Sequence, residues 1–282
     1  MKFFICYTQL VPAFQTTDGV RLHFKDWGEG QAVVFLHAYA LQSDAWAYQM
    51  DFLMLHGFRC IAYDRRGHGR SDCPASGYDY DTLANDLAAV LDHLDLNGVV
   101  LVGHSMGAGE IVRFFKKYGS ARAAGAILVA PNTPFMIRTD NNPAGLDPSI
   151  LDHLDRAISA DYPQTLRFMA DGLWGDDEKV SPDMKEWVYQ LGLQTSLIAA
   201  RACLQTAWRS DFRSDLAAID VPTLVIQGDC DKILPLHLSG RPTVEAIPGA
   251  RLAIYETAGH AIPLNQRDRL NQDLLDFLTT RI

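Results

Sequence analysis

The feature that most constrains the fold is the run 99–107, Val-Val-Leu-Val-Gly-His-Ser-Met-Gly, in which an apolar stretch leads straight into a Gly-x-Ser-x-Gly pattern. A helical pattern of apolar residues follows at once and ends at Gly119. A strand, a sharp turn and a helix in this order hold the serine exposed above a sheet, and the glycines let strand and helix approach closely. The run predicts that Ser105 is a nucleophile, an ordinary serine in a strand-to-helix turn being the alternative.

The remainder of the chain predicts an α/β fold, because strand-like runs alternate with helical patterns from residue 20 onward. Uninterrupted, β-branched apolar runs are typical of parallel strands buried on both faces. We therefore expect a mostly parallel central sheet flanked by helices. The expected strands are 32–36, 59–64, 99–102, 126–129, 223–226 and 252–255, and the expected helices are 80–94, 110–118 and 265–281.

The strand pattern disappears between residues 132 and 220, where helical stretches rich in Asp, Pro and aromatic residues replace it. A length of 282 residues suits one α/β domain with an insertion. We therefore predict an α/β core formed by 1–131 and 221–282, with 132–220 as a helical cap insertion.

Composition narrows the function classes. The chain has 25 basic and 34 acidic residues and a net charge of −9, with no dense basic run, so we expect no nucleic-acid partner. No apolar stretch approaches the roughly 20 residues that a membrane-spanning helix needs, so we expect no membrane partner. A small-molecule substrate is the expected partner, and a homo-oligomer is compatible with the sequence.

The five cysteines are scattered and show no Cys-x-x-Cys spacing, which predicts neither a disulfide framework nor a metal site. A reducing, cytoplasmic location is the simpler interpretation. The opening residues 1–7 carry one positive charge and a short apolar run, and no small-residue cleavage site follows. We interpret residues 1–12 as a short extension.

A serine hydroxyl becomes an effective nucleophile when an imidazole takes its proton and a carboxylate orients that imidazole. Beyond the serine, Asp231 follows the predicted strand 223–226 and His260 follows the predicted strand 252–255. The carboxyl ends of parallel strands meet at one edge of a sheet, where ligands bind. We therefore predict that Ser105, Asp231 and His260 form a catalytic triad.

Three other residues compete for the acid and base roles. Asp229 lies close to Asp231, but the Gly-x-x-Asp spacing from Gly228 favours Asp231. Asp229 is then expected to be a turn residue that bonds its own backbone. His153 and His237 lie in helical contexts without a preceding strand, so we expect them to be surface or packing residues.

A tetrahedral intermediate needs two backbone N–H donors for its oxyanion. The N–H of Met106, directly after the nucleophile, is one predicted donor. The second is the N–H of Tyr39, in the loop 37–40 that follows the predicted strand 32–36. The Tyr39 side chain is equally a candidate pocket wall, and we expect His37 to support the loop.

The charged run 64–71, Asp-Arg-Arg-Gly-His-Gly-Arg-Ser, has glycines spaced for a tight turn between a strand and a helix. No Lys-Ser pair or Gly-x-Gly-x-x-Gly helix start follows it, as a phosphate-binding loop would require. We expect this run to be scaffold.

Together these motifs resemble the cofactor-free (non-haem) haloperoxidase, perhydrolase and arylesterase branch of the α/β-hydrolase superfamily. The resemblance implies an α/β-hydrolase fold and a Ser-His-Asp esterase that needs no cofactor, metal or haem. In some relatives it also implies formation of peracids from carboxylic acids and hydrogen peroxide. The likeness runs over nearly the whole chain from about Thr17 and is carried by 17–19, 25–28, 63–67, 103–110, 142–146 and 270–275.

The sequence departs from this branch at the predicted oxyanion loop. Relatives commonly have His-Gly-Trp or His-Gly-Phe there, often followed by proline, whereas this chain has Ala38-Tyr39-Ala40. Plain ester hydrolysis does not depend on that proline, so the departure favours ester hydrolysis over peracid formation.

The predicted cap is expected to cover Ser105 and to supply an apolar pocket. Such a pocket would favour small aryl or short-chain acyl esters over charged substrates. Several of the same side chains are equally expected to pack the cap against the core. The candidate pocket residues are Tyr39, Phe135, Met136, Phe168, Trp174 and Trp187.

The sequence thus predicts a serine carboxylic-ester hydrolase of small molecules. Peracid formation, or hydrolysis of lactones, amides or carbon–carbon bonds, are alternatives on the same triad. A non-catalytic ligand receptor is an alternative from another class, because fold does not dictate function. Serine at position 105 argues against haloalkane dehalogenases and epoxide hydrolases, which use a carboxylate there.

Overall fold

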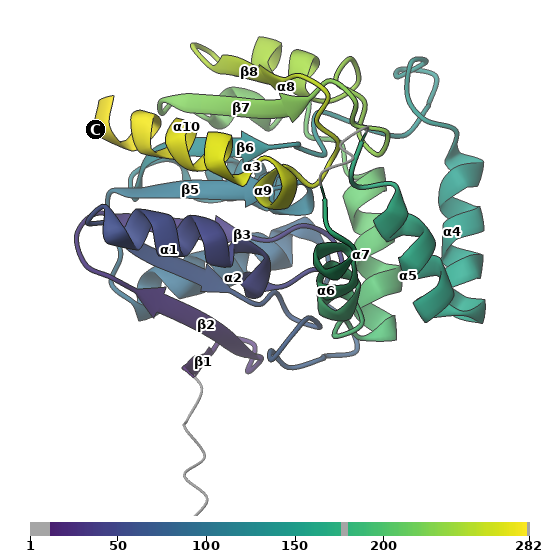
Figure 1. Cartoon of the computed structure of the whole chain (residues 1–282), viewed down its shortest axis with the longest axis horizontal. Coiled ribbons are helices and arrows are strands. Elements are labelled where there is room, and N and C mark those ends of the chain that lie inside the picture. The colour runs from purple at the N-terminus through teal and green to yellow at the C-terminus, as the bar shows by residue number, and fades with distance from the viewer. Residues whose placement is uncertain (1–11, 176–179, 281–282) are drawn as a thin grey trace, which may run out of the picture.

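The computed structural model describes residues 12–175 and 180–280, so most of the predicted opening extension, 1–12, lies outside the described residues. A single eight-stranded sheet forms its centre (Figure 1). The strands are β1 (Ala13–Gln15), β2 (Arg21–Trp27), β3 (Ala32–Leu36), β4 (Arg59–Tyr63), β5 (Val99–His104), β6 (Ala123–Val129), β7 (Thr223–Gly228) and β8 (Arg251–Tyr255).

The strand order is β1-β2-β4-β3-β5-β6-β7-β8. The six strands from β3 onward pair in parallel. At one edge β2 runs in the opposite direction, so that its pairings with β4 and with the edge strand β1 are antiparallel. Every residue of β3 and β5 is buried, as apolar, β-branched strands covered on both faces should be. The predicted class, a mostly parallel sheet with flanking helices, is confirmed.

Helices cover both faces of the sheet (Figure 1). One apolar cluster packs α2 and α3 against one face, and a second packs α1 and α10 against the other. The helices outside the 132–220 segment are α1 (Ala47–Leu55), α2 (Tyr80–His93), α3 (Met106–Tyr118), α8 (Gly240–Ala246), α9 (Ile262–Asn265) and α10 (Arg267–Thr280), with short 3₁₀ turns at Ser43–Trp46 and Leu216–Ala218.

Four helices fill most of the segment between β6 and β7, and we call them the cap helices: α4 (Pro148–Ala160), α5 (Tyr162–Asp171), α6 (Pro182–Gly192) and α7 (Leu197–Arg209). Each begins where an Asp or Ser side chain accepts a backbone N–H of the first turn. Figure 1 shows them beyond the ends toward which the arrows of β5 and β7 point. The cap helices therefore stand over the carboxyl edge of the sheet.

Within residues 12–175 and 180–280, no helix is long and apolar enough to cross a membrane. The four cysteines in these ranges, Cys60, Cys73, Cys203 and Cys230, form no disulfide with one another.

Candidate active site

Ser105 lies at the junction between β5 and α3, in a backbone conformation that non-glycine residues rarely adopt (φ 54°, ψ −114°). The flanking glycines make the junction sterically possible. A Cβ on Gly103 would lie 2.5 Å from the Gly107 carbonyl oxygen, and a Cβ on Gly107 would lie 2.4 Å from the Leu36 carbonyl oxygen. The sharp turn holds the serine side chain above the carboxyl edge of the sheet.

His260 and Asp231 meet beside this turn. Nδ1 of His260 lies 2.7 Å from Oδ2 of Asp231, and the two residues are 3% and 4% exposed. Because an ionised carboxylate can only accept, Nδ1 carries the proton and leaves Nε2 of the neutral ring able to accept one. This arrangement can take a proton from a hydroxyl group and stabilise the resulting imidazolium.

The Asp231 carboxylate is itself held in place by three further donors. The backbone N–H groups of Ile233 and Leu234 each donate to Oδ1 at 2.9 Å. The Gln227 side chain donates to Oδ2 at 2.8 Å. These contacts fix the position of the carboxylate relative to the imidazole ring.

His104 restrains the backbone of His260 through a hydrogen bond. Its Nε2–H donates to the His260 carbonyl at 2.8 Å, and the two rings lie 5.0 Å apart. The pKa of His104 is lowered to about 3, mainly by burial and to a smaller extent by the nearby His260. The ring of His104 is therefore neutral at pH 7.

The competing acid and base candidates lie elsewhere. Asp229 accepts the Thr257 backbone N–H at 2.7 Å, so it caps the loop after β8 instead of bonding its own backbone. His153 is exposed and contacts the Ser149 carbonyl one turn back in α4. His237 is exposed as well.

The loop after β3 is held by Arg65. Its guanidinium donates to the His37 carbonyl at 2.6 Å and more weakly to the Ala38 carbonyl at 3.4 Å. Its backbone N–H donates to Nε2 of His37 at 2.9 Å, and burial keeps the pKa of that histidine well below its usual value. Arg65 in turn donates through Nε to Glu110 of α3 at 2.6 Å. The backbone leading to Tyr39 is therefore tied to the helix that follows Ser105.

The rest of the 64–71 run is structural. Arg66 donates to Asp86 of α2 at 2.6 and 2.7 Å and also pairs with Asp18. Asp64 accepts the backbone N–H groups of Ser43 and Arg70. These contacts clamp the turn after β4 to the elements around it.

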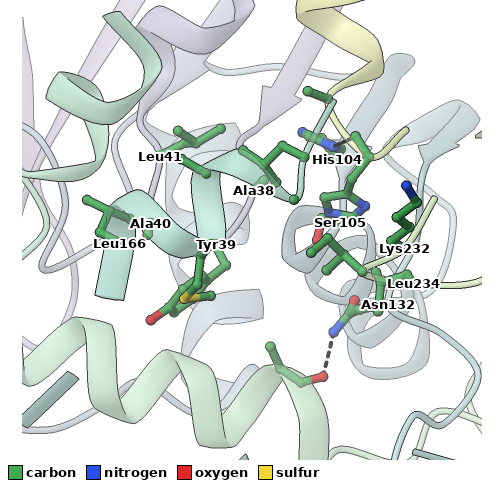
Figure 2. Close-up of a pocket in the computed structure, with 18 of the residues that line it drawn as sticks. Ala38, Tyr39, Ala40, Leu41, His104, Ser105, Asn132, Leu166, Lys232 and Leu234 are labelled. Atoms are coloured by element: carbon green, nitrogen blue, oxygen red, sulfur yellow. Dashed lines mark hydrogen bonds between the residues drawn. The ribbon is translucent and has the colours of Figure 1, made fainter. Parts of the chain in front are cut away.

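A cavity of about 600 Å³ opens between the carboxyl edge and the cap helices, and both Ser105 and His260 border it. Figure 2 shows Ser105 beside His104, across from the loop that carries Ala38 and Tyr39. Two exposed charged residues, Asp171 and Lys232, also border it. Most of the wall is apolar, including Leu146, Ile150, Leu154, Leu166, Val188, Trp208, Leu234 and Leu264.

Two of the predicted pocket residues border this cavity. Tyr39 does so while its hydroxyl donates to the Ala200 carbonyl at 2.9 Å. Phe168 borders it with 74% of its surface exposed, which places it at the rim.

The other predicted pocket residues do not border the cavity, so the sequence interpretation needs correction there. Phe135 packs among the apolar residues between α4 and α7, and Met136 is fully buried. Trp174 and Trp187, the latter a residue of α6, belong to an apolar cluster that joins α6 to the loop after β3. They bury apolar surface between cap and core, while aliphatic side chains supply most of the cavity wall.

We did not identify several polar or aromatic wall residues from the sequence, among them Asn132 and Trp208. Asn132 follows β6 at the same edge of the sheet as Ser105. Its position shortly after a predicted strand could have identified it as a candidate site residue. Trp208 lies in the last turn of α7, where no local pattern distinguishes a cavity wall from packing.

Comparison with known proteins agrees with this fold. The family model described as the alpha/beta hydrolase fold matches residues 31–266. The chain belongs to the α/β-hydrolase family, and it is a hydrolase of the serine type. The predicted resemblance is therefore confirmed.

The relatives fall in the cofactor-free branch. A non-haem chloroperoxidase of Kitasatospora aureofaciens is 37% identical, covering 95% of this chain and 99% of that protein. A bifunctional esterase/perhydrolase of Acinetobacter calcoaceticus is 35% identical, covering 93% and 98%. Among solved structures, an esterase from Exiguobacterium antarcticum superposes with a TM-score of 0.91 at 29% identity, covering 95% of this chain and 99% of that one.

Proposed function

We propose that the protein is a serine carboxylic-ester hydrolase that acts on small aryl or short-chain acyl esters. The observation that carries the proposal is the 2.7 Å contact between His260 and Asp231 beside a mostly apolar cavity that both His260 and Ser105 border. The names of the relatives, an esterase among them, support it.

In the proposed reaction, Oγ of Ser105 attacks the ester carbonyl while Nε2 of His260 takes the hydroxyl proton. Asp231 stabilises the imidazolium without becoming protonated. The imidazolium then protonates the leaving alcohol, and an acyl-enzyme remains on Ser105. Water, deprotonated by His260, hydrolyses this acyl-enzyme in the second half of the cycle.

The oxyanion of each tetrahedral intermediate is proposed to bind the backbone N–H groups of Met106 and Tyr39. Met106 is the first residue of α3, so its N–H has no acceptor one turn back, and the positive end of the helix lies there. Arg65 restrains the backbone before Tyr39 through the His37 and Ala38 carbonyls. A restrained donor stabilises developing charge without reorganisation during the reaction.

The cavity supports the proposed substrate size. A volume of about 600 Å³ suits a small organic ester. Most of its wall is aliphatic, and Asp171 and Lys232, which also line it, are exposed. Apolar acyl and aryl groups are therefore the groups it stabilises best.

A panel of p-nitrophenyl esters of increasing acyl length, together with lactones and anilides, tests the proposal. We expect the highest kcat/KM on short-chain esters and loss of that activity in Ser105→Ala. Preference for lactones or anilides, or equal rates on long and short acyl chains, would overturn it.

Peracid formation is the second candidate, favoured by the chloroperoxidase and perhydrolase names of the relatives. In that reaction hydrogen peroxide replaces water in attacking the acyl-enzyme, which yields the peracid. The test is peracetic acid production from acetate and hydrogen peroxide, compared with acetate ester hydrolysis by the same preparation. We expect ester hydrolysis to dominate, because this chain lacks the proline that relatives often have after the oxyanion loop.

A further inference from the structure

One side chain in the cavity wall has an acceptor atom that the proposed reaction does not use. Asn132 follows β6, borders the cavity and is 3% exposed. Its Oδ1 atom is buried and accepts no hydrogen bond from any residue that the structure describes. Most buried polar atoms have a partner, because leaving one without a partner destabilises the protein. A donor brought by a ligand would remove that cost.

The orientation of the Asn132 amide is fixed by its nitrogen. Nδ2 donates to the Tyr80 hydroxyl oxygen at 2.7 Å and to the Ala207 carbonyl oxygen at 2.8 Å. A carbonyl can only accept, so rotating the amide by half a turn would place two acceptors face to face. Oδ1 is therefore held as an acceptor, and in Figure 2 it faces the side on which Ser105 lies.

The nitrogen has a structural role that does not extend to the oxygen. Ala207 lies in the last turn of α7, where helix carbonyls lack donors within the helix. Nδ2 thus satisfies a cap carbonyl and ties α7 to the core. Nothing in this role requires an oxygen on the opposite side of the amide.

Asn132 also lies close to the reacting atoms. The Ser105 backbone N–H donates to the carbonyl of Val129, the last residue of β6, at 2.8 Å, and Asn132 follows soon after in the chain. Figure 2 shows Ser105 and Asn132 on the same wall, with Leu234 beside them. A group that reaches Oδ1 must therefore belong to a part of the substrate near its scissile carbonyl.

We propose that Asn132 determines specificity by accepting a hydrogen bond from a substrate hydroxyl or N–H group carried near the ester carbonyl. The proposal rests on the proposed function and deepens it. The substrate class is hydroxy-substituted or amide-substituted short esters, with the donor in the acyl part or in the alcohol part. The mostly apolar wall makes this acceptor selective, because a donor placed against an apolar part of the wall would lose its water without a partner.

Two matched ester pairs test the proposal. In the acyl pair, p-nitrophenyl 2-hydroxypropanoate is compared with p-nitrophenyl propanoate. In the alcohol pair, 2-hydroxyethyl butanoate is compared with propyl butanoate. The readout is the kcat/KM ratio within each pair, measured for the wild type and for Asn132→Leu, which has a similar volume and no acceptor.

We expect Asn132→Leu to lower the kcat/KM ratio of the donor-bearing ester to its partner about tenfold in one of the two pairs. This is the contribution of one hydrogen bond to a buried acceptor. Intrinsic reactivity differences cancel, since they are the same for both proteins. The pair that responds identifies where the donor sits. Unchanged ratios in both pairs would overturn the proposal, because a purely structural Asn132 would slow both members equally.

Tyr80→Phe is the matched control, since it removes one acceptor of Nδ2 and leaves Oδ1 untouched. We expect it to preserve both ratios. Asn132→Ala repeats the measurement if the leucine variant does not fold. Failure of the wild type to hydrolyse any of the four esters would instead overturn the proposed function itself.

Discussion

Arg65 and Glu110 form an ion pair in which each side chain is only 1% exposed, and this pair joins the end of β4 to the helix that follows Ser105. The hydroxyl of Tyr63 donates to the same carboxylate at 3.0 Å. Because Arg65 also donates to the His37 carbonyl, one buried guanidinium connects α3 with the loop that carries Tyr39. We therefore expect both stability and the proposed catalysis to depend on this pair.

Glu110→Gln is expected to destabilise the protein by about 3–5 kcal/mol, because it leaves a buried guanidinium without its charge partner. Urea unfolding measures the change. The control is Asp155→Asn, which removes the partner of the half-exposed Arg201 and is expected to cost about 1 kcal/mol or less. Equal effects of the two variants would contradict the structural role of the buried pair.

Asp231→Asn is expected to lower kcat by about 10³–10⁴, because the amide favours the wrong histidine tautomer and stabilises no imidazolium. Its matched control is Asp229→Asn, two positions away, whose carboxylate contacts only the loop after β8 in the contacts described. We expect that variant to keep kcat within about threefold. Steady-state kinetics on one p-nitrophenyl ester compares them, and a reversed order would assign the acid role to Asp229.

Gly107→Ala is expected to impair both folding and turnover. Its Cβ would lie 2.4 Å from the Leu36 carbonyl oxygen and would push α3 away from β3. Gly119→Ala is the control for backbone strain alone. Gly119 has a φ of 68°, and a Cβ added there would meet no atom within 4 Å, so we expect a cost of about 1–2 kcal/mol and unchanged kcat/KM. Thermal unfolding and ester kinetics on both variants test this difference. Equal loss of activity in the two variants would argue against the close approach at Gly107.

Stability is expected to fall steeply below about pH 6.5. Burial, the main cause, lowers the pKa of His68 and His104 to about 3, so the native state holds both rings neutral. The unfolded chain binds these protons near pH 6.5, so the stabilisation is complete above that pH and is lost as the pH falls toward 3. Each histidine contributes about 1.4 kcal/mol per pH unit in that window.

His68→Gln is expected to reduce this slope by about 1.4 kcal/mol per pH unit between pH 6 and 5. Urea unfolding at closely spaced pH values gives the slope. The exposed His153→Gln variant should leave it unchanged. A slope that is the same in the wild type and both variants would mean that His68 is not held neutral in the native state.

The sequence was sufficient for the fold and for the residues around Ser105 because the relevant signals are local. Buried parallel strands are continuous apolar runs, so β3 begins and ends where the pattern predicted, 32–36. Asp231 and His260 each follow such a strand, and the topology then brings them to one edge. The antiparallel β1 and β2 were not predicted individually, since edge strands carry polar residues that blur the pattern.

The cavity wall was harder to predict because it depends on how the cap helices pack. Large apolar side chains such as Phe135 and Trp174 are expected to be buried, but the sequence does not distinguish a packed interface from a cavity wall. Phe168 and Phe135 therefore looked alike in sequence, although one borders the cavity and the other packs between helices. The unpartnered oxygen of Asn132 is a property of three-dimensional contacts alone.

The most direct test of the central proposal is to trap the acyl-enzyme. The protein is mixed with p-nitrophenyl acetate in slight excess and quenched in acid within milliseconds, and the intact mass and peptide masses are measured. We predict a burst of p-nitrophenolate, at most one equivalent per chain, together with one acetyl group on the peptide that contains Ser105, and neither in Ser105→Ala. An acetyl group on another residue, or undiminished turnover by Ser105→Ala, would contradict the assignment of Ser105 as the nucleophile.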